Sequence, residues 1–165
     1  MTSFASRGRR AAVAAALVGA VVLIGPPAAA AGPFAQLDGT WSGSGSIKLD
    51  DGKSERLKCR AYYTPKSGGA AIGLALRCAS ASNKIELRAN LTAESGRVSG
   101  SWEERTFNAA GTVTGQASPS QIKLVITGGG FSGSMAVTTT GQNQVISVST
   151  QGVALKGVNI SLRRD

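Results

Sequence analysis

The chain has 165 residues, with 18 lysines and arginines against 9 aspartates and glutamates, no histidine and two cysteines. Its length favours a single domain, and the lack of histidine excludes a Ser-His-Asp triad, a Cys-His pair and a histidine-ligated zinc or haem. Two cysteines are too few for a four-thiolate metal site. These counts predict no catalytic residues, no metal and no cofactor, and we expect a protein that is not an enzyme.

The first residues have the pattern of a signal peptide. Three arginines lie within the first ten residues, and residues 11–24 form an uncharged, mostly apolar run that is shorter than the about 20 residues of a transmembrane helix. Alanines at 28–31 suit a signal peptidase. We therefore expect an exported protein, periplasmic or secreted, with no transmembrane segment after cleavage; general secretory and twin-arginine export both stay open. The predicted division of the chain is a cleaved signal peptide at 1–31, an N-terminal tail at 32–38 and one β-barrel domain at 39–165.

The rest of the chain is predicted to be strands. From Gly39 onwards apolar and polar residues alternate with period two, and glycine-rich or polar turns interrupt the alternation at short intervals. Every connection is short, which favours antiparallel neighbours, and closing the sheet removes its edges. The prediction is an all-β fold, an antiparallel up-and-down β-barrel of about 8–10 strands. The alternation slips near Lys156 and Gly157, which predicts a β-bulge there.

The two cysteines predict a disulfide across a hairpin. A turn placed at Ser67 to Ala70, next to Pro65, brings Cys59 opposite Cys78 at non-hydrogen-bonded positions, within disulfide range. The alternative is a redox-active pair, but the sequence has no C-x-x-C motif and no cation on the same strand face. We expect a structural disulfide, which also suits an oxidising compartment.

Gly39-Thr40-Trp41 opens the first predicted strand. A G-x-W at this place, followed by a meander of eight to ten strands, resembles the calycin superfamily, which includes lipocalins, fatty-acid-binding proteins, avidins and nitrobindins. The resemblance implies that Trp41 lies at the closed end of a barrel, with a basic residue from near the C-terminus packed across it. Arg164 is the candidate for that residue. The missing histidine departs from the haem ligand of nitrobindins.

The inward-facing positions supply a candidate ligand site. Glu104 has inward parity near a barrel end, either as a polar anchor for a ligand or, the interpretation we favour, exposed at the rim; a buried carboxylate would need a partner such as Arg164 or Lys48. The inward glycines are expected to leave room in the interior: Gly43, Gly45, Gly100, Gly115 and Gly133. We expect a small apolar or amphipathic ligand. The candidate lining residues are Tyr63, Trp102, Glu104, Phe131 and Met135.

An alternative function uses the outside of the barrel. Five basic residues share the outward face of three successive strands and would attract an anionic envelope surface: Lys58, Arg60, Arg77, Lys84 and Arg88. The chain also resembles the exported alkaline-protease inhibitors of bacteria, which act through an N-terminal tail. A solvated face and a free, frayed tail are the simpler interpretations. Nucleic acid is not an expected partner, since aromatic residues do not interleave with the basic ones.

Overall fold

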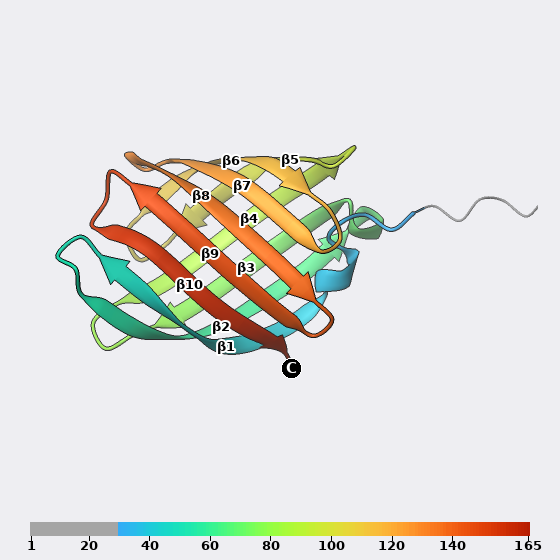
Figure 1. The fold of residues 1–165 in the computed structure, drawn as a ribbon. Helices are drawn as coiled ribbons and strands as arrows, with labels where there is room; N and C mark the ends of the chain where they lie inside the picture. Colours follow the sequence, from blue (N-terminus) through green and yellow to red (C-terminus); the bar gives the residue numbers. More distant parts are fainter. Residues whose placement is uncertain (1–29) are drawn as a thin grey trace, which may run out of the picture.

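The computed structural model describes residues 30–165, and the predicted signal peptide lies almost wholly outside this range. Residues 30–165 form ten antiparallel strands in a closed barrel, in which every strand pairs with its sequence neighbours and β1 pairs with β10 (Figure 1). Two short 3-10 helices, η1 (Ala35–Leu37) and η2 (Ser67–Gly69), accompany the strands. The strands are β1 (Gly39–Leu49), β2 (Ser54–Lys66), β3 (Ala71–Ala79), β4 (Lys84–Glu94), β5 (Arg97–Glu104), β6 (Ala109–Ala117), β7 (Gln121–Gly128), β8 (Phe131–Thr140), β9 (Asn143–Gln151) and β10 (Leu155–Arg164).

This architecture confirms the predicted all-β, up-and-down barrel. Alternation sets the two faces of each strand: in β2, the alternate residues Leu57, Cys59, Ala61 and Tyr63 are buried, while Lys58, Arg60 and Tyr62 between them are exposed. The predicted bulge is also present, because Lys48 pairs with Gly157 and Leu49 pairs with Leu155, which leaves Lys156 as the extra residue. Within the described range, no helix has the length and apolar character that crossing a membrane requires.

The inward glycines have a different role from the one predicted. A Cβ added at Gly43 would lie 2.0 Å from the carbonyl oxygen of Ser161, and one added at Gly115 would lie 2.1 Å from that of Lys123. These atoms belong to the backbone of the neighbouring strand, and none of the five glycines lines the interior cavity. The glycines therefore allow a strand to approach the backbone of its neighbour closely. The expectation that they leave room for a ligand is wrong.

The two ends of the barrel differ. At one end, η1 folds across the opening, and Phe34 and Leu37 are buried, with 0% and 2% of their surfaces exposed. The backbone N–H groups of Gly32 and Phe34 donate to the carbonyl oxygens of Gly68 and Gly69 in the hairpin between β2 and β3. The segment before β1 therefore closes this end of the barrel (Figure 1). The expectation of a free, frayed tail is wrong, because the burial of Phe34 and Leu37 and the backbone hydrogen bonds of Gly32 and Phe34 hold the segment against the barrel.

Candidate functional site

The barrel interior contains a cavity of about 480 Å³ at the end opposite η1. Its walls come from the inward faces of the strands, and its mouth from the loops that follow odd-numbered strands, where Asn83, Phe107 and Val153 lie. An apolar cavity of about 150 Å³ is large enough for benzene, so this cavity has room for a ligand about three times that size. Its lining is almost wholly aliphatic and aromatic, and Asn83, Glu104 and Thr150 are the polar side chains among the described lining residues.

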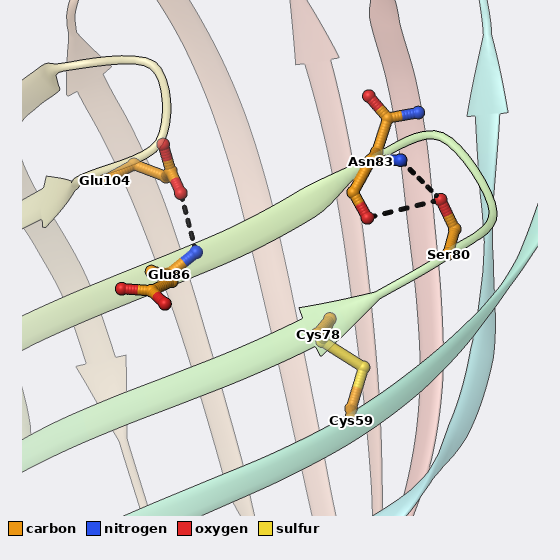
Figure 2. Close-up of a disulfide and its surroundings, with 6 residues drawn as sticks. All are labelled: Cys59, Cys78, Ser80, Asn83, Glu86 and Glu104. Carbon is orange, nitrogen blue, oxygen red and sulfur yellow. Dashed lines mark hydrogen bonds between the residues drawn. A yellow bond between two sulfur atoms is a disulfide. The ribbon is translucent and has the colours of Figure 1, made fainter.

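Glu104 is the last residue of β5 and points into the barrel. Its Oε1 accepts the backbone N–H of Glu86 at 2.6 Å, and its Oε2 accepts that of Phe107 at 2.7 Å; Figure 2 shows the first of these bonds. Only 9% of the residue is exposed. The carboxylate thus ties the start of β4 and the β5–β6 turn to the end of β5.

This geometry corrects the favoured interpretation of Glu104 as a residue exposed at the rim. The predicted partners are also wrong, because backbone N–H groups, and not Arg164 or Lys48, satisfy the carboxylate. A buried carboxylate needs hydrogen-bond donors. One of them is the backbone N–H of Phe107 in the turn at 105–108, and no sequence pattern marks such a group.

A second carboxylate holds the β3–β4 loop at the mouth. Glu55 of β2 accepts hydrogen bonds from the hydroxyls of Ser80 and Ser82 and from Nδ2 of Asn83. Because these groups, Ser80 and Ser82 first, donate to the charged form, the pKa of Glu55 lies below its ordinary value of 4.5. Ser80 also bonds to the backbone of Asn83 in both directions (Figure 2). These hydrogen bonds tie the loop that carries Asn83 to β2 beside the cavity.

The disulfide lies next to this loop. The sulfur atoms of Cys59 in β2 and Cys78 in β3 are 2.08 Å apart, and both residues are buried (Figure 2). The register is the predicted one, with Cys59 opposite Cys78 and Lys66 opposite Ala71. The bond therefore joins two neighbouring strands just before the β3–β4 loop.

The structure separates the residues predicted to line a ligand site. Trp102, Glu104 and Met135 line the cavity. Tyr63 lies at the closed end, where its hydroxyl bonds to Gln144, and the side chain of Phe131 is outside the described part of the structure. Sequence reasoning missed Phe107, a loop residue at the mouth that is 62% exposed, because loops have no alternation that shows which way a side chain points.

The predicted tryptophan–arginine pair lies at the closed end. The guanidinium carbon of Arg164 is 4.7 Å from the centroid of the Trp41 ring, and the two residues are direct neighbours in the β1–β10 register. Trp41 is fully buried, and its Nε1 donates to the carbonyl oxygen of Leu37 at 2.8 Å. The ring therefore joins η1, β1 and β10 in one packed end.

The predicted basic residues all lie exposed on the outer face of β2, β3 and β4. Arg60 is opposite Arg77, as the register predicts, but Arg77 is also opposite Glu86, and Arg88 is opposite Glu103. Acidic neighbours thus dilute the positive charge of this face. In residues 30–165, no three acidic or cysteine side chains come together as metal ligands do.

Comparison with known proteins shows the fold. No protein-family model matches the chain, and no curated protein matches it in sequence. Among solved structures, the S-type phycobiliprotein lyase CpeS from Guillardia theta is 13% identical, with a TM-score of 0.58 over 80% of this chain and 90% of that chain. Rv2717c from M. tuberculosis is 14% identical, with a TM-score of 0.58 over 79% of this chain and 93% of that chain. At these identities the likeness establishes the architecture alone.

The likeness to a lyase corrects one prediction. The residue counts were expected to exclude an enzyme, yet the same barrel forms a phycobiliprotein lyase. The exclusion is wrong, because one fold can support both catalysis and binding, and a missing histidine removes only histidine-dependent chemistry. What the comparison supports is the architecture: residues 30–165 form a closed ten-stranded antiparallel barrel, and both solved structures resemble it in fold.

Proposed function

We propose that the protein binds a small apolar or amphipathic ligand inside the barrel. The observation that carries this proposal is the cavity of about 480 Å³, which lies within the usual range of ligand sites and is lined almost entirely by apolar side chains. Each methylene group that leaves water for such a lining contributes about 0.8 kcal/mol. A hydrocarbon chain or ring system is therefore the kind of ligand that these walls favour.

The proposal extends the likeness to the ligand-binding calycins, such as lipocalins and fatty-acid-binding proteins. It also includes export. The apolar leader and the disulfide between Cys59 and Cys78 both suit a protein that works in an oxidising compartment. Mass spectrometry of the mature N-terminus, with cleavage expected after Ala30 or Ala31, tests this part separately.

Two neighbouring alanines of β6 allow a direct test of the binding site. Ala109 lines the cavity, whereas Ala110 is exposed on the outer wall. Ala109→Phe would fill part of the cavity next to its mouth, and Ala110→Phe adds the same ring outside. We expect 1-decanol to quench or shift the part of the tryptophan fluorescence that comes from Trp102, the tryptophan in the cavity wall, in the wild type and in Ala110→Phe. We expect it to bind at least about tenfold more weakly to Ala109→Phe.

Native mass spectrometry after gentle purification gives an independent readout. A co-purifying lipid-like mass that is present in Ala110→Phe and absent from Ala109→Phe supports the proposal. Equal binding of 1-decanol to both variants would place the ligand elsewhere. No saturable binding of 1-decanol to the wild type would reject an interior site for apolar ligands.

A further inference from the structure

The polar groups at the cavity are unequally available to a ligand. Nε1 of Trp102 donates to the carbonyl oxygen of Thr127 at 3.2 Å, and the hydroxyl of Thr150 donates to the carbonyl oxygen of Leu155. Nδ2 of Asn83 donates to Oε2 of Glu55 at 3.3 Å and to Oγ of Ser82 at 2.9 Å, which uses both of its protons. Among the described lining residues, every side-chain hydrogen-bond donor is therefore already engaged within the protein.

The carboxylate of Glu104, unlike these donors, still has free hydrogen-bonding capacity. Glu104 is the one ionisable side chain among the described lining residues, and neither lysine nor arginine is among them. A carboxylate has about four lone-pair positions, and Glu86 and Phe107 occupy two of them. Glu104 thus keeps free acceptor positions in a cavity whose lining is almost wholly apolar.

We propose that the ligand is an amphipathic molecule whose polar end donates hydrogen bonds, a primary amine above all, with Glu104 as its acceptor. This inference rests on the proposed binding function and specifies the chemical class of the ligand. A carboxylic acid of the same chain length is disfavoured, because its anion would meet the Glu104 carboxylate and find no free side-chain donor or cation in the cavity wall.

The position of Glu104 also sets the orientation of the ligand. The residue ends β5 beside the loop at 105–108, close to the mouth, whereas Val113 and Leu124 line the apolar part of the wall. The amine end then lies near the mouth, where water lowers the cost of keeping its charge, and the hydrocarbon lies along the aliphatic wall.

The test compares three ligands of one chain length, n-decylamine, 1-decanol and decanoate, by calorimetric titration below their micelle-forming concentrations. We expect decylamine to bind the wild type roughly tenfold or more tightly than decanoate, the size of effect that one hydrogen bond to a charged group produces. The full sequence has a net charge of +9, which becomes +6 when the leader and its three arginines are removed. Either charge would by itself favour the anionic decanoate, so long-range attraction cannot produce this order.

The matched variants are Glu104→Gln and Glu103→Gln, adjacent residues of β5 that face inward and outward. Glu104→Gln should lose most of the advantage of decylamine over 1-decanol, and Glu103→Gln should keep it. If Glu104→Gln does not fold, the amide resonances of Glu86 and Phe107 in the wild type provide the readout, and decylamine should shift them more than 1-decanol does.

The outcomes of this test separate the choice of ligand class from the existence of the interior site. Decanoate binding as tightly as decylamine, an unchanged amine preference in Glu104→Gln, or equal amide shifts with both ligands would overturn the assignment. If 1-decanol still binds in those cases, the interior site itself stands. Failure of all three ligands to bind would reject the proposed function together with the ligand class.

Discussion

The hydroxyl of Tyr63 donates a hydrogen bond of 2.6 Å to Oε1 of Gln144, joining β2 to β9 across the closed end of the barrel. Gln144 is itself buried, and its Nε2 donates to Oγ1 of Thr139 at 3.3 Å. The Tyr63 ring packs edge-on against Trp41, with the ring centroids 6.2 Å apart. This polar link lies within the hydrophobic end that η1 covers.

Tyr63→Phe should lower the free energy of unfolding by about 1–3 kcal/mol, because it leaves the buried acceptor of Gln144 without its donor. Urea denaturation followed by circular dichroism measures the change. Tyr62→Phe is the matched control, since Tyr62 is the next residue, faces outward and is 37% exposed. Equal stabilities of the two variants would show that the Tyr63–Gln144 bond contributes nothing.

Alkaline pH should destabilise the protein through the same residue. Burial disfavours the charged phenolate and raises the pKa of Tyr63 well above its ordinary value of 10.0. The folded state therefore holds the phenol proton more tightly than the unfolded state does. The resulting stability is complete below about pH 10 and decreases as the pH rises above it. Unfolding curves between pH 9 and 12 should show a steeper loss in the wild type than in Tyr63→Phe; parallel losses would contradict this origin.

Acid should loosen the mouth through Glu55. Hydrogen bonds from Ser80, Ser82 and Asn83 lower the pKa of Glu55 in the folded state. The contribution of Glu55 to stability is therefore present above about pH 4.5 and is lost as the pH falls through the folded pKa. Amide exchange of Asn83 should lose protection over that range. In Glu55→Gln the protection should already be low at neutral pH, whereas Glu94→Gln, an exposed carboxylate, should behave as the wild type. Protection in Glu55→Gln equal to that of the wild type would refute this role.

Gly43→Ala should destabilise the closure between β1 and β10. The new Cβ would lie 2.0 Å from the carbonyl oxygen of Ser161, a backbone atom that cannot move without the strand. We expect a loss of about 1–3 kcal/mol, the usual cost of overpacking. Ser44→Ala, one residue along on the outer face, should change stability by less than about 0.5 kcal/mol. Urea denaturation of both variants checks the difference, and a Gly43→Ala protein as stable as Ser44→Ala would contradict the close approach.

Reduction of the Cys59–Cys78 bond should lower the free energy of unfolding by about 3 kcal/mol, because the bond closes a loop with a sequence separation of 19. Guanidinium denaturation with and without reductant measures this loss. An alkylating reagent should label neither cysteine in the native protein before reduction. Labelling without reductant would show that the two sulfurs are free thiols.

The hairpin and the bulge could be predicted from sequence because both depend on counting. The turn residues next to Pro65 fix which residues pair, and one pairing then fixes every other pair in that hairpin, Cys59 with Cys78 included. Lys156 interrupts an otherwise regular alternation, so the bulge is visible as a change of parity. A period-two pattern therefore shows directly which residues share a face and where the alternation shifts.

The partners of Glu104 could not be predicted, because backbone N–H groups look the same at every residue. The pairing of Tyr63 with Gln144 joins residues 81 positions apart, and no local pattern relates them. The docking of Phe34 was missed for a related reason: a short apolar segment before the first strand has no period, and only the open end of a barrel creates a place for it. The glycines were misjudged because sequence shows a missing side chain but not the neighbouring backbone that requires it.

The closed end has a practical consequence for experiments on the cavity. The segment from Gly32 to Leu37 and the end of β10 at Arg164 both lie at this end, on the opposite side of the barrel from the loops at 80–83 and 105–108 (Figure 1). A protein immobilised on a sensor surface through its C-terminus would therefore keep its mouth toward the solution. The hairpin loops at the mouth lie at the other end of the barrel from Trp41, so we expect that a library of loop variants would leave the packing around Trp41 unchanged.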